Sequence, residues 1–340
     1  MTFARSRGLD LVARMGQRRA TMYLSCFCRR LVLVVGLGGL GATVAWSDWR
    51  RDDRTLAWLA GDQVVWQFSF DAARGKPFFH PLGAVGGASL TNFRPEDHPW
   101  HYGLWFSWKY INGVNYWEEE RTTGKAQGAT RWTPPTITSR PDGSATVRMD
   151  LTYVARTGQI DLTEVRVLEI SAPAADGSYT IDWQARFTAG PAGAVLDRTP
   201  MPGEPKGQPN GGYAGLSLRM AGAPLAIAFL TSEVPVTEFT RDRARPAAPA
   251  VACNFAEEGR AVGGVAILSD PANSGERAPW YLIHSAQMRF VCAALLAPKP
   301  LVLRAGGTLA LRYRVAVSRA AWTPAGLQAA WRQWALPAAR

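Results

Sequence analysis

Histidine is the residue type that most clearly marks a place for chemistry in this sequence. Three of the four histidines, His80, His98 and His101, lie between residues 80 and 101. An imidazole has an ordinary pKa of about 6.5, so it can take up or release a proton at neutral pH. Glu118 follows soon afterwards and could act as the complementary acid or base. We therefore predict His98 and His101, with Glu118 as partner and His80 nearby, as candidate catalytic residues.

Aromatic side chains fill the interval between the histidines and the glutamate. Indole rings stack on the apolar faces of sugar rings, so this composition is typical of a carbohydrate cleft. Burial of a tryptophan side chain contributes several kcal/mol, and we expect most of these rings to lie in the core. Trp105 and Trp108 are our candidates for ligand contact. The aromatic residues of the run are Tyr102, Trp105, Phe106, Trp108, Tyr110, Tyr116 and Trp117.

Four further polar residues are candidates for binding a substrate. Asp97 directly precedes His98 and could orient its ring by accepting the ring N–H. Tyr213 and Arg219 belong to a second segment of the chain, and His284 belongs to a third. Arg219 occupies a strand position, where it is either paired with an internal acid or binds a hydroxyl-rich or anionic ligand.

These residues also have plainer interpretations. His98 and His101 could be hydrogen-bonded structural histidines of a turn, and Glu119 and Glu120 could form a solvated acidic turn. The spacing of the two histidines also permits a shared metal ion. The third ligand would then be His80, Glu118 or His284.

The sequence requires no cofactor, and a divalent metal is one of the alternatives. It contains no Gly-rich phosphate loop between a strand and a helix, no Gly-x-Ser-x-Gly elbow and no Cys/His nucleophile arrangement. These absences disfavour nucleotide-dependent enzymes and triad hydrolases.

The first 45 residues have the composition of an export signal. Seven arginines and one aspartate precede the apolar run Leu31–Trp46, in the order of the charged and apolar regions of a signal peptide. We predict cleavage near Ala45 and a periplasmic or secreted mature protein. An uncleaved anchor is the alternative, but the apolar run is shorter than the ~20 residues of a spanning helix and is interrupted by four glycines. We expect no membrane span in the mature chain.

The formal net charge of the whole chain is +11. Removal of the leader takes away seven arginines and one aspartate and lowers the charge to +5. No stripe of basic residues with interleaved aromatics occurs in the mature chain, so nucleic acid is not an expected partner. Cys26 and Cys28 belong to the leader, whereas Cys253 and Cys292 could either pair or remain separate buried thiols.

Alternation of apolar and polar residues with a period of two recurs through the mature chain, as in Val147–Tyr153 and Tyr179–Phe187. Such alternation is typical of half-buried strands. Turn signals such as Asp142-Gly143 and Asp176-Gly177 separate the runs at short intervals, which predicts antiparallel hairpins. We predict an all-β fold, a large antiparallel two-sheet sandwich with a short C-terminal helix.

The predicted helix covers about residues 323–335. Thr323 is its N-cap and Pro324 its first residue, while Leu327, Trp331 and Trp334 share one face. We expect this helix to pack across a sheet or to cover a sheet edge.

We predict that residues 46–340 form a single β-sandwich domain with a core over about residues 53–318. No stretch is rich enough in Gly, Ser or Pro to act as a linker between domains. The segment Pro200–Gly212 is interpreted instead as a long loop, and loops of this length are often functional.

Several blocks of the sequence resemble a known bacterial family. They are Lys76–Leu82, Thr91–Phe106 with its His-Pro-Trp-His motif, Asn112–Glu119, Gly212–Arg219 and Leu311–Arg314. Together they resemble the PmoA-like family of unknown function. That family is similar to the galactose-mutarotase-like supersandwich group, whose members bind sugars in a cleft on one sheet with histidines and a carboxylate. The resemblance implies this fold and a carbohydrate ligand, but it assigns no catalytic residue.

The label of that family names a methane oxygenase subunit, which would need several membrane-spanning helices. We regard the label as physically unsupported. The observations favour an exported carbohydrate-active protein, a glycoside hydrolase, lyase or epimerase that uses a His/Glu acid–base pair in an aromatic cleft. The alternatives are a non-catalytic glycan-binding or cell-envelope interaction module, and a metal-dependent enzyme built on the histidine cluster.

Overall fold

The structure, a computed structural model, describes residues 47–336. The predicted export signal over residues 1–45, with Cys26, Cys28 and the cleavage site near Ala45, lies outside the described residues. The predicted domain boundaries stay a prediction.

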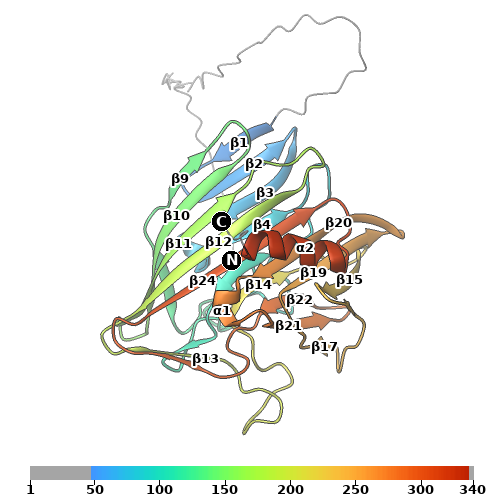
Figure 1. Ribbon diagram of the computed structural model, residues 1–340. Coiled ribbons are helices and arrows are strands. Elements are labelled where there is room, and N and C mark those ends of the chain that lie inside the picture. The colour runs from blue at the N-terminus through green and yellow to red at the C-terminus, as the bar shows by residue number, and fades with distance from the viewer. Residues whose placement is uncertain (1–46, 337–340) are drawn as a thin grey trace, which may run out of the picture. The chain divides into compact units, whose positions relative to one another are not determined.

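Two ten-stranded antiparallel sheets make up most of the molecule (Figure 1). In spatial order, the first sheet contains β1 (Ser47–Arg51), β2 (Thr55–Ala60), β3 (Gln63–Ser69), β4 (Phe78–Leu82), β5 (Leu104–Ser107), β14 (Gly215–Arg219), β22 (Arg289–Ala293), β21 (Ala278–His284) and β17 (Arg243–Ala244), with β18 (Ala247–Ala248) also paired to β21. The second sheet contains β16 (Pro235–Val236), β15 (Ala226–Thr231), β19 (Ala250–Glu257), β20 (Arg260–Ser269), β24 (Thr308–Ser318), β12 (Tyr179–Ala189), β11 (Ile160–Ile170), β10 (Ala145–Val154) and β8 (Ala129–Trp132), with β9 (Thr136–Ser139) paired to β10.

A smaller four-stranded sheet holds β23 (Leu301–Leu303), β13 (Ala194–Asp197), β6 (Tyr110–Ile111) and β7 (Val114–Asn115). Three short helical segments complete the described elements: η1 (Ala72–Arg74), α1 (Pro271–Ser274) and α2 (Pro324–Ala335). The prediction of an all-β antiparallel sandwich with a C-terminal helix is confirmed. The small sheet and the first hairpin, β1–β2, were not predicted.

The period-two alternation explains how the sheets pack. Val147, Met149, Leu151 and Tyr153 of β10 are all buried and point inward, while the residues between them are less buried. Inward-facing side chains of the two large sheets form one large core between these sheets. Burial of apolar surface at about 25 cal/mol/Å² makes this layer the main source of stability.

The outer face of the second sheet is covered by α2. Thr323 caps the helix by accepting a hydrogen bond from the Gly326 amide at 3.1 Å. Leu327, Trp331 and Trp334 are buried against β15, β19 and β20, and Figure 1 shows α2 lying across this part of the sheet. The predicted N-cap and the predicted apolar face of the helix are both confirmed.

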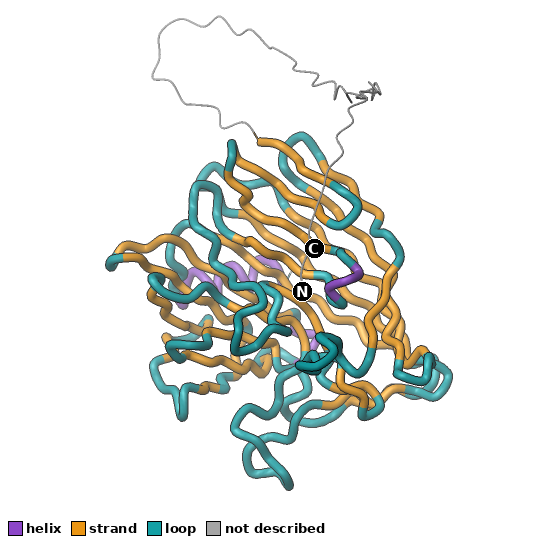
Figure 2. Tube along the Cα trace, turned by 180° about the vertical axis from the view of Figure 1, so that it is seen from behind, coloured by secondary structure: helices purple, strands orange, loops and turns teal. Residues whose placement is uncertain are grey.

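The outer face of the first sheet is covered by loops instead of a helix. Figure 2, the view from behind, shows the loops gathered toward the lower half of the molecule. Under them lies a second cluster of buried aromatic side chains, which we call the outer aromatic cluster. Its buried members are Phe78, Tyr102, Trp105, Trp117, Tyr213, Tyr281, Ile283, Phe290, Cys292 and Ala294.

Candidate functional site

The segment between β4 and β5 carries His98 and His101 and is folded back on itself. Phe93 and Tyr102 form an isolated antiparallel bridge, and the Arg94 amide donates to the His101 carbonyl at 2.8 Å. The His98 amide donates to the Pro95 carbonyl at 3.1 Å, and the His101 amide donates to the His98 carbonyl at 2.9 Å. The segment is therefore a closed turn that fixes the backbone of both histidines.

Gly103 joins this turn to β5 at a point where only glycine fits. Its φ is +66°, and a Cβ atom there would lie 2.3 Å from the Phe79 carbonyl oxygen. Its carbonyl accepts a hydrogen bond from the Arg219 amide of β14 at 2.7 Å. A side chain at Gly103 would push the histidine turn away from the sheet.

Asp97 joins the histidine turn to β14 through a charged contact. The Arg219 Nη2 atom lies 2.9 Å from each carboxylate oxygen of Asp97 and also donates to the Gln287 carbonyl at 2.7 Å. Partial burial raises the pKa of Asp97, but hydrogen bonds from His98 and Arg219 outweigh this effect and hold the pKa below its ordinary value. Asp97 is therefore ionised at neutral pH.

His98 is oriented by this carboxylate. Its Nδ1 lies 2.8 Å from Asp97 Oδ2, and an ionised carboxylate can only accept, so Nδ1 carries the proton. The side chain is 34% exposed, so the opposite nitrogen, Nε2, is the one available to a ligand. An Asp–His pair of this form holds the ring in one tautomer and stabilises the imidazolium when it forms.

His101 stacks on His98, with ring centroids 4.8 Å apart, and is buried. Phe290 stacks on it at 5.1 Å and Trp105 lies at the same distance. Burial, followed by the charges of His98, Arg219 and Lys76, lowers the pKa of His101 well below its ordinary value. His101 is therefore neutral. Its Nδ1 faces Arg219 Nη1 at 3.4 Å and must accept, so Nε2–H is a donor.

Glu118 is held in place by the β6–β7 hairpin. Asn112 and Gly113 have φ values of +50° and +76°, as a tight hairpin turn requires, and the turn brings Lys109 back beside Tyr116 and Glu118. Asn115 accepts from the Glu118 amide at 3.2 Å through Oδ1 and donates to its carboxylate at 2.7 Å through Nδ2.

The Glu118 carboxylate accepts hydrogen bonds from three different donors: Lys109 Nζ, Tyr213 OH and Asn115 Nδ2. Burial raises the pKa of Glu118, but Lys109, Tyr213 and Asn115 outweigh this effect and hold the pKa below its ordinary value. The side chain is nevertheless 23% exposed. Glu118 is therefore an ionised acceptor that a ligand can still reach.

His98 and Glu118 line the same cavity, of about 180 Å³, on the outer face of the first sheet. We call it the histidine cavity. Its walls are mostly aromatic, and Trp100 is their half-buried member. The lining residues are His98, Trp100, His101, Trp117, Glu118, Asn210, Tyr213, Arg243, Tyr281, Ile283, Met288 and Phe290.

Several predicted residues meet at this cavity. His98, His101, Glu118 and Tyr213 line it directly. Asp97 and Arg219 lie behind the histidines and hold them. These six were predicted as catalytic or substrate-binding residues, and their roles stay predictions.

Four other predicted residues do not reach the cavity. Trp105 is fully buried beneath His101, and Trp108 lies on the opposite face of the sheet, in the core between the sheets. His80 donates to or accepts from Thr91 Oγ1 at 2.9 Å and stacks on Phe93, and burial lowers its pKa. His284 is exposed beside Phe229 and Phe239.

The alternation of side chains along a strand explains why His284 and Trp108 do not reach the cavity. Successive side chains of a strand point to opposite faces, so His284 faces away from the cavity that Tyr281 and Ile283 line. Trp108 is three residues beyond Trp105 and therefore cannot share its face. Trp105, Trp108, His80 and His284 therefore do not contact a ligand in this cavity, contrary to our prediction.

Glu119 and Glu120 form ion pairs within the protein and do not line the histidine cavity. Glu119 is buried, accepts from Arg94 Nη1 at 2.9 Å and from Tyr102 OH, and lies 3.9 Å from Lys76 Nζ. Burial lowers the pKa of Lys76 to about 8, against the opposing effect of Glu119. Glu120 pairs with Arg156 at the surface.

No three His, Cys, Asp or Glu side chains within residues 47–336 are placed to share a metal ion. Cys253 and Cys292 are free and buried on different sheets. In the same part of the chain, no helix is long and apolar enough to cross a membrane.

Sequence reasoning missed Lys109, Phe290 and Arg243. Lys109 interrupts the run Trp108-Lys109-Tyr110, and a lysine between two large aromatic residues was a usable signal of a buried ion pair. Arg243 belongs to Arg241-Asp242-Arg243-Ala244-Arg245, whose three arginines were also visible. Phe290 gave no such signal.

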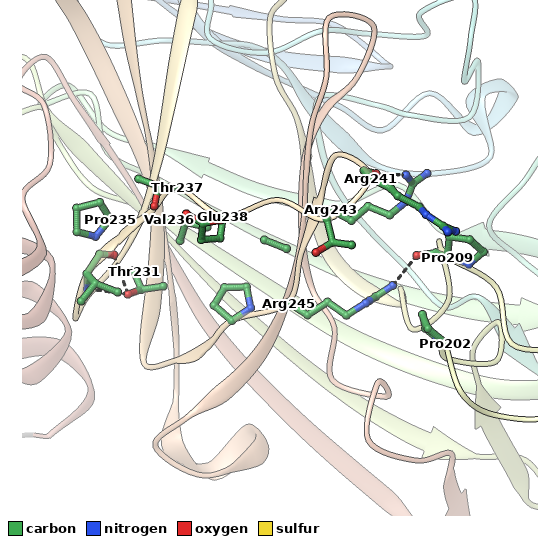
Figure 3. Close-up of a pocket in the computed structure, with 14 residues that line it drawn as sticks. Pro202, Pro209, Thr231, Pro235, Val236, Thr237, Glu238, Arg241, Arg243 and Arg245 are labelled. Carbon is green, nitrogen blue, oxygen red and sulfur yellow. Dashed lines mark hydrogen bonds between the residues drawn. The ribbon is translucent and has the colours of Figure 1, made fainter.

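A second and larger depression, of about 670 Å³, shares a lining residue with the histidine cavity, and Figure 3 shows the residues that line this depression. Arg243 lines both, and the neighbouring loop residues Pro209 and Asn210 line one each. We call this depression the arginine groove, because Arg241, Arg243 and Arg245 all line it.

Fold and site together define a β-sandwich protein with a histidine- and carboxylate-lined cavity on the outer face of one sheet. Residues 55–332 match the model of a family of unknown function, DUF6807, and the chain belongs to that family. The PmoA-like label is not part of this match and stays a prediction. No curated protein sequence matches the chain.

Solved structures similar to the chain at low identity include the following three. The galactosidase domain of an alpha-galactosidase-sucrose kinase is 9% identical with a TM-score of 0.41, over 80% of this chain and 40% of that one. An alpha-galactosidase from Lactobacillus brevis is 10% identical with a TM-score of 0.43, over 84% of this chain and 41% of that one. A proposed aldose 1-epimerase from Klebsiella pneumoniae is 8% identical with a TM-score of 0.45, over 82% and 83%. The chain thus spans about two fifths of the two galactosidases.

Proposed function

We propose that this protein is a carbohydrate-active enzyme that transfers protons to and from a saccharide bound in the histidine cavity. The observation that carries the proposal is the meeting of His98 and Glu118 in one aromatic-walled cavity. Both groups are fixed by further hydrogen bonds, and fixed orientation is what an acid–base pair needs for efficient proton transfer.

The contacts of each residue suggest its role. His98, with its Nδ1–H bound to Asp97, accepts or returns a proton at Nε2. His101 is neutral and, because its Nδ1 accepts from Arg219, offers its Nε2–H as a donor to the ligand. Glu118 is ionised and therefore serves as an acceptor or a base, while its lowered pKa makes it a poor general acid.

The reaction class follows from the number of carboxylates. Among the described residues that line the cavity, Glu118 is the one carboxylate. Most glycoside hydrolases use two carboxylates on opposite sides of the scissile bond. A histidine with one carboxylate fits proton abstraction and return better, which favours a lyase or an epimerase over a hydrolase.

The size of the cavity limits what it holds. At ~30 Å³ per water molecule, a volume of 180 Å³ corresponds to roughly six waters. That space suits one sugar unit, with Trp100 as the half-buried ring for stacking. Any further unit of the ligand would extend beyond the cavity.

A thermal-shift screen of the purified protein against mono-, oligo- and uronic saccharides tests this proposal. We expect one sugar class to raise the melting temperature of wild type and of the control His284→Ala, whose histidine lies outside the cavity. His98→Ala should fold but respond differently to the same sugar. Turnover of that sugar should fall by about 10²- to 10⁴-fold in His98→Ala.

Two results would overturn the proposal. One is the absence of a response to every saccharide. The other is unchanged turnover in both His98→Ala and His101→Ala, because then neither imidazole takes part in the reaction.

The second candidate is a non-catalytic glycan-binding module. The observation in its favour is the set of three donors that fix Glu118 as a permanent acceptor. This candidate predicts that saccharide affinity survives His98→Ala but not Trp100→Ala, and that no product forms in either case.

Export to the periplasm or beyond is part of the proposal and rests on the basic and apolar leader. Fractionation of cells that express the full chain should recover a shortened protein outside the cytoplasm. Recovery of uncleaved chain in the cytoplasm would contradict it.

A further inference from the structure

The arginine groove continues the wall of the histidine cavity. Arg243 lies on the edge strand β17 and lines both spaces, and the loop at Pro209 and Asn210 borders both. The groove, at about 670 Å³, is also much larger than the cavity. A ligand too long for the histidine cavity would therefore extend into this groove.

The three arginines of the groove have no acidic partner. Within residues 47–336, no carboxylate oxygen lies within 4.0 Å of a side-chain nitrogen of Arg241, Arg243 or Arg245. Most other buried or half-buried cations near the cavity are neutralised, as Arg219 is by Asp97 and Lys109 by Glu118. The charged residues that line the groove are these three arginines and Glu238, so its lining carries a net positive charge.

Neutral groups hold two of these guanidinium groups in place. Arg243 Nε donates to Tyr281 OH at 3.1 Å, and Arg243 Nη1 donates to the Arg241 carbonyl. Arg245 lies over the Tyr281 ring at 4.2 Å and donates through Nη2 to the Pro209 carbonyl at 3.0 Å. These contacts orient the cations without cancelling their charge.

One donor atom of an arginine that lines the groove is also unsatisfied. Arg245 Nη1 is buried and has no hydrogen-bond partner among the described residues. A buried donor without a partner costs free energy, which an acceptor in the groove would recover if the guanidinium group turned to present this atom. Burial lowers the pKa of Arg245, as expected for a cation that lacks a counter-ion.

The distribution of charge within the groove is uneven. Figure 3 shows Arg241, Arg243 and Arg245 on the same side as Pro202 and Pro209, whereas Glu238 lies with Thr237 and Val236 on the other side. The arginine side is the side that adjoins the histidine cavity, because Arg243 belongs to both.

We propose that the arginine groove is an anionic subsite, and that the saccharide bound in the histidine cavity carries a carboxylate or sulfate group which Arg243 and Arg245 receive. This inference rests on the proposed function and names the substrate class for it. Arginine suits the task because its planar donors match the paired oxygens of carboxylate and sulfate groups. A uronic acid unit and a sulfated sugar unit share this chemistry.

The test is calorimetric titration of the full chain with three saccharides of matched length: an oligogalacturonide, a sulfated oligosaccharide and an uncharged oligogalactoside. We expect wild type to prefer one of the two acidic ligands over the uncharged one. Arg245→Gln and Arg243→Gln should each weaken that acidic ligand by about ten- to a hundredfold and reduce the preference. Added salt should weaken the acidic ligand more than the uncharged one.

Arg332→Gln is the matched control, because it removes the same charge from an exposed position on α2, over the other sheet. Thermal unfolding of each variant checks folding, and Arg243→Lys, which keeps the charge, should restore part of the preference. Equal affinity of wild type for charged and uncharged ligands would overturn the subsite while leaving saccharide binding intact. An equal loss in Arg332→Gln would also overturn it. Failure of every saccharide to bind would instead refute the proposed function itself.

Discussion

Two glutamates of this protein have similar partners but different access to solvent. Glu164 on β11 accepts from Arg166 Nε at 2.6 Å, from Arg166 Nη2 at 2.9 Å and from Tyr153 OH at 2.6 Å. Glu118 likewise accepts from a cation and from a tyrosine, Lys109 and Tyr213. The Glu164 side chain is 0% exposed in the inner core, whereas that of Glu118 is 23% exposed at a cavity wall.

The comparison shows that the partners of a carboxylate do not by themselves determine its role. Both groups are held by a cation and a phenol, but only Glu118 can contact a ligand. In the core the arrangement cross-links three inward-facing side chains of β10 and β11. At the cavity the same arrangement keeps an acceptor ionised and fixed.

The largest loss of stability is expected when Arg166, the cation paired with Glu164 in the core, is removed. Arg166→Met leaves Glu164 charged and buried without a counter-ion, which should lower the free energy of unfolding by about 3–5 kcal/mol. Urea denaturation measures this change. The double variant Glu164→Leu/Arg166→Met should recover most of the loss, and a loss below about 1 kcal/mol in the single variant would contradict the prediction.

A smaller effect is expected when the cation at the cavity is removed. Lys109→Met leaves Glu118 with Asn115 and Tyr213 and with access to water, so we expect a loss of about 1–2 kcal/mol. Lys109→Arg, which keeps the charge, serves as the control. If Lys109→Met were as damaging as Arg166→Met, the two sites would not differ in the way we propose.

The two glutamates should separate most clearly in ligand binding. Glu118→Gln should weaken binding of the stabilising saccharide by about tenfold, which corresponds to about 1.4 kcal/mol. Glu164→Gln should lower the melting temperature but leave that affinity unchanged. Calorimetric titration of both variants is the measurement, and equal affinities in the two variants would contradict a role for Glu118 at the cavity.

The smallest effect concerns stability in acid. The pKa of Glu118 is lowered in the folded state from its ordinary value of 4.5. Its contribution to stability is therefore fully present above that value and is lost as the pH falls through the lowered folded pKa. The free energy of unfolding should decrease more steeply in acid for wild type than for Glu118→Gln. Parallel curves for the two proteins would show that Glu118 gains nothing from its partners.

The fold could be predicted because its signals are local. Period-two alternation in Val147–Tyr153 and Tyr179–Phe187 shows one buried face for each strand, and the structure places both in the core as β10 and β12. The capping and periodicity of residues 323–335 similarly determine α2. By contrast, β6 and β7 have two residues each, too few for any alternation to be visible.

The site could be predicted only in part because strand order is not a local property. The clustering of His98, His101 and Glu118 was visible, since all three lie within one segment. Phe290 joins them because β22 lies beside β14, and Arg243 because β17 pairs with β21. Nothing in the sequence of these strands states which neighbour each will have.

Within residues 47–336, Cys253 and Cys292 are free, and each can report how often the part of the molecule around it opens. Cys253 lies on β19 in the inner core, and Cys292 lies on β22 in the outer aromatic cluster. Burial raises the pKa of Cys292 to about 12 and also raises that of Cys253, so neither thiol reacts while its layer is closed. The rate at which an alkylating reagent modifies each cysteine therefore reports how often that layer opens. If a ligand slows modification of Cys292 but not of Cys253, it stabilises the outer aromatic cluster and leaves the inner core unchanged.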